Sequence, residues 1–91
     1  MPDPQRCRAT IRRWKPGATG GLAVADLPAD VAQALGGLRQ RRVEGTINGA
    51  PFTSSVMPAG GGVLCLSVSK AMLTAAGAAV GDGVDLEIAL A

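Results

Sequence analysis

The chain has 91 residues, a length that fits a single small domain. Hydrophobic residues make up 47% of it and aromatic residues only 2%, so aliphatic side chains must build the core. Histidine is absent, which removes the commonest general base and metal ligand, and no apolar stretch approaches the roughly 20 residues of a membrane span. These features speak against an enzyme, a metal site and a membrane protein.

The beginning of the chain predicts a frayed end and two strands. Residues 1–5 contain two prolines and are expected to be disordered. Polar and apolar residues alternate over 6–14, which is typical of a half-buried strand. A loop rich in proline and glycine over 15–21 leads into a second short strand at 22–27.

A short helix and a third strand are expected next. Pro28 suits the first turn of a helix, and Gly36 and Gly37 end that helix. A strand at 41–47 follows. The apolar face of the helix is predicted to hold Val31, Ala34, Leu35 and Leu38.

The clearest local signal in the chain is a hairpin turn at Asn48 and Gly49. This pair supplies the positive φ angles of a type I′ turn, here between the strand at 41–47 and another at 52–57. Pro51 suits the start or the edge of that second strand.

A largely apolar strand at 63–68 and a second short helix come next. Ser69 is a candidate N-cap for a helix over 71–76, and Gly77 ends this helix.

A turn at Gly81 and Asp82 leads into the final strand at 84–90, in which apolar and polar residues alternate. Asp82 is expected to be structural, because a short carboxylate in a tight turn accepts backbone N–H groups. The order β-β-α-β-β-β-α-β predicts a mainly β fold, a closed small barrel of six strands with two short helices, with residues 6–91 as one domain.

The pattern β-β-α-β occurs twice, over about 6–47 and 50–91. A shift of 41 residues aligns 22–47 with 63–88 without a gap. The alignment indicates an internal repeat with pseudo-two-fold symmetry. Such a barrel closes within one chain, so both a monomer and a homodimer of whole barrels fit the sequence.

Basic residues concentrate in the first half of the chain. They suggest a nucleic-acid-binding face in which cations hold phosphates and an indole stacks on a base. The alternative is a solvated surface, with Trp14 packed over one end of the barrel. The residues of the predicted face are Arg8, Arg12, Trp14, Arg39 and Arg42.

Other patterns offer little chemistry. Cys7 and Cys65 lack the spacing of a metal or redox motif and are expected to be reduced packing residues. We predict no catalytic residue, no metal and no cofactor. Glycine-rich stretches at 17–21 and 60–62, placed at a barrel mouth, leave a small-ligand or enzyme site as an alternative.

Three segments carry a resemblance to a known family: the helix start at Leu27 and Pro28, the hairpin VEGTINGAPF over 43–52, and the closing turn GDGV over 81–84. They resemble a bacterial family of small barrels of unknown function, found alone or ahead of a YdeI/OmpD-associated domain. The resemblance covers about residues 7–90. It implies a six-stranded barrel and supplies no catalytic residue.

A more distant resemblance joins Ser69 and Lys70 with the turn at 81–84. These residues look like the GD-box of swapped-hairpin barrels, a group that includes DNA-binding regulators of the AbrB/MazE type. The first repeat departs from that pattern, because Gln40, Arg41 and Arg42 stand where the glycine–aspartate box should recur.

The sequence therefore predicts a non-enzymatic binding or interaction module with an unidentified protein or small-molecule partner and no membrane contact. The polar, arginine-rich N-terminus is unlike a secretory signal, so we expect a cytoplasmic protein. A nucleic-acid-binding regulator and a small-ligand site remain the alternatives.

Overall fold

The computed structural model describes residues 4–14 and 23–91. The order of strands and helices is the predicted one, although β1 already begins within the stretch expected to be disordered. The loop at 15–21 and the start of the second strand at Leu22 lie outside the described residues. The elements are β1 (Gln5–Arg13), β2 (Ala23–Leu27), α1 (Ala29–Ala34), β3 (Arg41–Ile47), β4 (Ala50–Gly60), β5 (Val63–Val68), α2 (Lys70–Ala76) and β6 (Gly83–Leu90).

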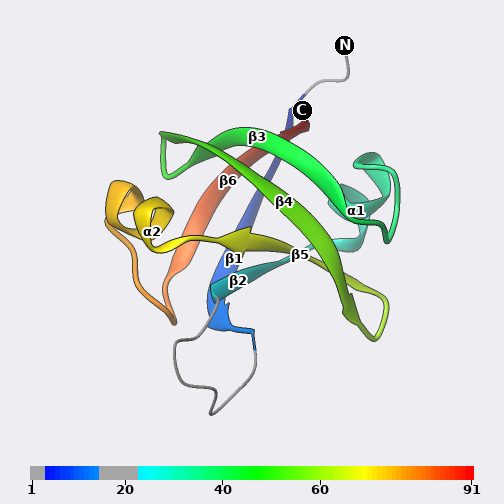
Figure 1. Cartoon of the computed structure of the whole chain (residues 1–91), viewed down its shortest axis with the longest axis horizontal. Helices are drawn as coiled ribbons and strands as arrows, with labels where there is room; N and C mark the ends of the chain where they lie inside the picture. The colour runs from blue at the N-terminus through cyan, green and yellow to red at the C-terminus, as the bar shows by residue number, and fades with distance from the viewer. Residues whose placement is uncertain (1–3, 15–22) are drawn as a thin grey trace.

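The strands form a closed barrel in the order β1-β2-β5-β4-β3-β6, and every neighbouring pair is antiparallel (Figure 1). Closure gives each strand a partner on both sides, although β1 pairs with β2 only from Ile11 to Arg13 and β4 pairs with β5 only from Val56 to Gly60. This architecture confirms the predicted mainly β fold with a six-stranded barrel and two short helices.

The barrel interior is filled by aliphatic side chains from all six strands. Side chains alternate between the interior and the surface, as the period of two requires. Among the described residues no polar or charged residue is buried. The innermost side chains include Ile11, Val43, Ile47, Leu64, Leu66 and Ile88, each at most 1% exposed.

The two helices lie at opposite ends of the barrel (Figure 1). Helix α1 packs against β1 and β5, and α2 packs against β4. The predicted apolar face of α1 is only half right: Val31 and Leu35 are buried, but Ala34 and Leu38 are exposed. The helix ends at Ala34, so Leu38 follows it in a turn and no longer shares its face. No helix in the described part of the chain has the length and apolarity to cross a bilayer.

Helix α2 begins and ends as its sequence predicts. The Ser69 hydroxyl accepts a hydrogen bond from the Met72 backbone N–H at 3.1 Å, which is an N-cap. Gly77 adopts the left-handed conformation with φ 64° and ends the helix.

The hairpin between β3 and β4 turns at Asn48 (φ 49°) and Gly49 (φ 83°), which follow Ile47 and precede its cross-strand partner Ala50. Asn48 also reaches beyond the hairpin. Its N–H donates to the Asp85 carbonyl at 2.8 Å, its Oδ1 accepts from the Asp85 N–H at 2.9 Å, and its Nδ2 donates to the Ala76 carbonyl at 3.2 Å. One residue therefore joins the turn to both β6 and α2.

Strands β3 and β6 approach each other closely at Gly45. A Cβ atom at this position would overlap the Glu87 carbonyl oxygen and lie 2.8 Å from the carbon of that carbonyl and 3.2 Å from the Ile88 Cα. Only glycine fits here without a shift of the backbone.

The strand registers are related by a two-fold exchange of the halves of the chain. Ala25 pairs with Leu66 and Thr46 pairs with Glu87, and in both pairs the partner lies 41 residues later. The same shift of 41 residues converts each flanking pair into another pair of the same two strands. For β1 and β4 the shift is 45 residues, because the chain from Ile11 to its partner Ala25 is four residues longer than the chain from the equivalent Val56 to Leu66. Accordingly, Arg8 pairs with Asp85 as Thr53 pairs with Glu44.

Candidate functional site

Two of the arginines predicted to bind nucleic acid form ion pairs with aspartates of neighbouring strands on the outer surface of the barrel. The Arg8 Nη1 lies 3.0 Å from the Asp85 Oδ1 across β1 and β6. The Arg12 guanidinium holds Asp26 through two bonds, Nε to Oδ2 at 2.7 Å and Nη2 to Oδ1 at 2.9 Å. This hydrogen bond is the main reason that the pKa of Arg12 is raised. Both arginines therefore already have an anionic partner.

The other residues of the predicted face are divided between the two ends of the barrel. Strands β1 and β3 both run antiparallel to β6, so they run parallel to each other. Arg12 and Trp14 lie at the end of β1, near the start of β6, where the Ile11 N–H donates to the Asp82 carbonyl. Arg42 lies at the start of β3 and accepts a backbone bond from Ala91, just after the end of β6, and Arg39 precedes it in the turn after α1. The structure does not bring these residues together.

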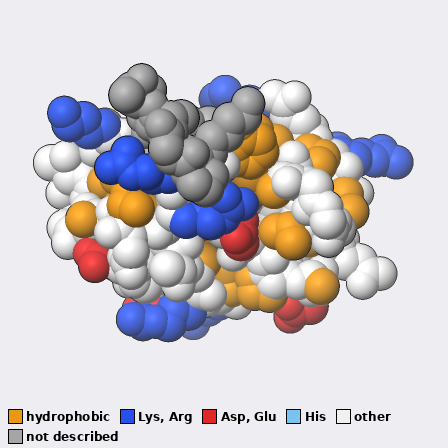
Figure 2. All heavy atoms as spheres, turned by 90° about the horizontal axis from the view of Figure 1, so that it is seen from below, with side chains coloured by type: hydrophobic (Ala, Val, Ile, Leu, Met, Phe, Trp, Pro, Cys, Tyr) orange, Lys and Arg blue, Asp and Glu red, His pale blue; other side chains and the backbone are white. Residues whose placement is uncertain are grey.

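Figure 2 shows the basic side chains of one face in several separate groups, with apolar and acidic side chains between some of them. Trp14 is half-buried, and its carbonyl accepts a bond from the Arg12 Nη1 at 3.5 Å.

The turn before β6 is held by Asp82. Its Oδ2 accepts from the Ala79 N–H at 2.9 Å, while the Asp82 N–H donates to the Ala79 carbonyl at 3.0 Å. The preceding Gly81 N–H donates to the Ile11 carbonyl at 2.8 Å. The carboxylate thus fixes the entry to the last strand, and Gly81 ties the turn to β1.

The two cysteines are free thiols: Cys65 is buried and Cys7 is half-buried. Burial is the main cause that raises the pKa of each thiol above its ordinary value, so both are protonated and poorly nucleophilic at neutral pH. Within the described ranges no cluster of cysteine, aspartate and glutamate could hold a metal ion.

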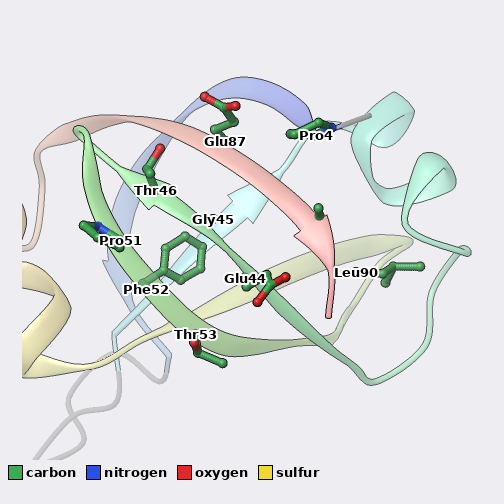
Figure 3. Close-up of a pocket in the computed structure, with 10 residues that line it drawn as sticks. Pro4, Glu44, Gly45, Thr46, Pro51, Phe52, Thr53, Glu87 and Leu90 are labelled. Carbon is green, nitrogen blue, oxygen red and sulfur yellow. The ribbon is translucent and has the colours of Figure 1, made fainter. Parts of the chain in front are cut away.

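A groove of about 810 Å³ lies on the outer wall over β3, β4 and β6 (Figure 3). We call it the β3–β4–β6 groove. Its lining combines two carboxylates and two hydroxyls with an apolar surface, to which Pro4, Ala89 and Leu90 contribute. The central residues are Glu44, Thr46, Pro51, Phe52, Thr53 and Glu87.

Gly45 opens the floor of this groove. Phe52 is its cross-strand partner and is only 8% exposed, yet it lines the groove because Gly45 has no side chain to cover the ring. In Figure 3 the Phe52 ring lies between Pro51 and Glu44 and faces the Gly45 segment. Glu44 is exposed and has no ion-pair or hydrogen-bond partner for its carboxylate among the described residues.

A second groove of about 540 Å³ lies over β1, β6 and β3. It contains Arg6 and Arg8, which pair with Glu87 at 3.7 Å and with Asp85 at 3.0 Å. We call it the β1–β6 groove. The stretch 60–62, expected at a ligand-binding mouth, lines neither groove, and the stretch 17–21 lies outside the described residues.

Sequence reasoning missed the β3–β4–β6 groove, because its parts come from three strands and from residues as far apart as Pro4 and Leu90. One signal was present in the sequence. A glycine inside the strand 41–47 marks a close approach of two backbones, and such a position leaves the neighbouring side chains uncovered.

Barrel and groove together define a small closed β-barrel domain with two helical caps and a partly apolar, acidic groove on its wall. The sequence profile of a family described as a domain of unknown function (DUF1905) matches residues 8–88. The chain belongs to this family, which confirms the expected small-barrel family of unknown function. A search of curated proteins found no match.

Proposed function

We propose that this domain is a non-enzymatic binding module and that the β3–β4–β6 groove is its ligand site. The observation that carries the proposal is the groove itself: apolar surface from Pro51 and Phe52 lies beside Glu44, a carboxylate with no partner among the described residues. Small-ligand and peptide sites combine apolar surface with a few polar anchors in this way.

An NMR fragment screen on ¹⁵N-labelled protein tests the proposal. We expect bound fragments to shift the amide signals of Gly45, Thr46 and Thr53 more than those of the remaining barrel. Ala89→Leu, which fills the groove from β6, should reduce these shifts. The matched control is Ser55→Leu, on the outer face of β4 but outside the groove lining. Fragments that bind only elsewhere, or not at all, overturn the proposal.

A nucleic-acid-binding regulator is the second candidate function. It is favoured by Arg39, Arg41 and Arg42, which are exposed and have no carboxylate partner among the described residues. It is disfavoured by Arg8 and Arg12, whose guanidinium groups are held by aspartates.

Fluorescence anisotropy with labelled duplex and single-stranded DNA separates the two candidates. We expect at most weak binding at low salt that vanishes at physiological salt, since a short basic segment releases few counterions. Tight binding at physiological salt that Arg42→Ala abolishes would make the regulator the better proposal.

We further infer that the chain arose by internal duplication of a β-β-α-β unit and is related to the swapped-hairpin barrels. The symmetric registers through Ala25 and Leu66 and through Thr46 and Glu87 support the duplication. The Gly81–Asp82 turn supports the relation to GD-box barrels in the second repeat only.

We propose that the protein is bacterial and works in the cytoplasm. The free thiols of Cys7 and Cys65 suit a reducing compartment. Closure of the barrel within one chain supports a monomer as the working unit, since every strand already has a neighbour from the same chain on both sides.

A further inference from the structure

The two grooves occupy equivalent places on the barrel. The exchange of halves that relates the strand registers places all the residues that line the β1–β6 groove on residues that line the β3–β4–β6 groove. The carboxylate of Asp85 corresponds to that of Glu44, and Arg8 corresponds to Thr53. The outer pair of Arg6 and Glu87 corresponds to Pro51 and Thr46.

The equivalent positions differ in how their charge is balanced. In the β1–β6 groove the carboxylate of Asp85 is neutralised by Arg8 from the adjacent strand. In the β3–β4–β6 groove the corresponding neighbour of Glu44 is Thr53, which carries no charge. The β3–β4–β6 groove therefore retains the carboxylate and lacks the guanidinium that would balance it.

We propose, on the basis of the binding function proposed above, that the β3–β4–β6 groove binds an arginine side chain of a protein partner. The guanidinium lies on the Glu44 carboxylate, where the β1–β6 groove holds the guanidinium of Arg8 on Asp85. The alkyl stem and the planar face of the guanidinium pack over Phe52 and Pro51.

The charges of the lining favour an arginine within a polypeptide over the free amino acid. The lining contains Glu44 and Glu87 and no lysine or arginine among the described residues. A free arginine carries an α-ammonium and an α-carboxylate as well as its guanidinium, and this lining offers no cationic side chain to hold that carboxylate. An arginine in a peptide chain has no such carboxylate.

NMR titration of ¹⁵N-labelled protein with N-acetyl-arginine amide tests the proposal, with N-acetyl-citrulline amide as the uncharged control of the same shape. We expect saturable shifts at Gly45, Thr46 and Thr53, and binding about fivefold weaker for the citrulline compound. The amide signals of Arg8 and Asp85, which lie in the β1–β6 groove, should not shift. Equal binding of both compounds overturns the guanidinium assignment, and free arginine that binds as well as the blocked compound overturns the protein source.

Two variants test the roles of Glu44 and of the missing cation. Glu44→Gln should weaken binding about fivefold. Thr53→Arg places an arginine where Arg8 stands in the other groove, so it should pair with Glu44 and abolish binding. Ser55→Arg adds the same charge on the same strand outside the groove and should leave binding within about twofold, apart from general repulsion. Unchanged binding in both Glu44→Gln and Thr53→Arg overturns the proposal.

The test separates this inference from the proposed function. Neutral fragments that map to the groove, while the arginine compound does not, overturn the arginine assignment alone. If neither binds there, the groove is not a ligand site and the proposed function fails with it.

Discussion

At the scale of single residues, the barrel depends on one position that has no side chain. Gly45 lets β3 pass so close to the Glu87 carbonyl that a methyl group does not fit. The same glycine uncovers the Phe52 ring. One residue therefore serves both closure of the barrel and formation of the groove.

We expect Gly45→Ala to lower the free energy of unfolding by at least about 2 kcal/mol, because backbone rather than a flexible side chain must move. Urea unfolding followed by far-UV circular dichroism measures the change. Gly83→Ala is the control: its Cβ meets the exposed, flexible side chain of Arg8, with Nε at 3.2 Å, and should cost well under about 1 kcal/mol. Equal losses in both variants would contradict this account.

The buried thiol of Cys65 predicts a pH dependence of stability. Burial raises its pKa in the folded chain above that of the unfolded chain. The resulting contribution of the Cys65 thiol to the stability of the folded chain is fully present below the pKa of the unfolded thiol, about 8.5. It is lost as the pH rises through the pKa of the folded thiol. The chain has no tyrosine to add its own titration there.

Urea unfolding at pH 7 and at pH 10 measures this effect, and we expect stability to fall between them. Cys65→Ala should lose less stability over the same range than the unchanged protein does. A loss of the same size in the variant would show that another group is responsible.

At the scale of elements, the hairpin between β3 and β4 is more than a local turn. Asn48 bonds to Asp85 on β6 and to Ala76 at the end of α2. The Asn-Gly pair predicts the turn from local conformation alone, but the contacts to β6 and α2 follow only from the closure of the barrel.

Replacements of Asn48 separate these two roles. Asn48→Gly keeps a residue that accepts positive φ and loses only the side-chain bonds, so it should cost about 1–2 kcal/mol. Asn48→Ala also strains the turn and should cost about 1–3 kcal/mol more. Thermal unfolding ranks the variants, and an alanine variant as stable as the glycine variant would contradict the role of the turn conformation.

At the scale of the whole molecule, the order of elements and the closed barrel could be predicted from the sequence. Periodicity and turn residues act locally, so they revealed the strands, the cap at Ser69 and the hairpin at Asn48. The arrangement of the surface could not be predicted. The sequence does not tell that Arg12 meets Asp26 across two strands, or that Arg42 lies at the other end of the barrel from Arg12.

The β3–β4–β6 groove was beyond prediction for a similar reason. In the sequence, Glu44 and Thr53 look like ordinary solvated residues of two strands in which polar and apolar side chains alternate. Only the register across three strands shows that they border an apolar floor and that their counterparts, Asp85 and Arg8, form an ion pair.

The closed barrel also predicts where the chain tolerates new ends. The first and last strands bring the described ends of the chain together, since Gln5 at the start of β1 pairs with Ile88 near the end of β6. A circular permutant that joins the ends by a short flexible linker and opens at the exposed turn of Gly61 and Gly62 should keep the barrel. Opening at Asn48 and Gly49 should destabilise it more, because that turn anchors α2 and β6. Circular dichroism melting compares the two, and the reverse order would refute the role assigned to Asn48.

The equivalence of the two grooves has a consequence for how such a barrel can change. In an assembly of two identical half-chains, every substitution appears on both faces at once. Here Glu44 and Asp85 are separate positions on one chain, so either can vary while the other stays as it is. In the β1–β6 groove the carboxylates of Asp85 and Glu87 are paired with Arg8 and Arg6 of the same chain. The β3–β4–β6 groove can therefore change its ligand specificity at Glu44 without loss of these ion pairs.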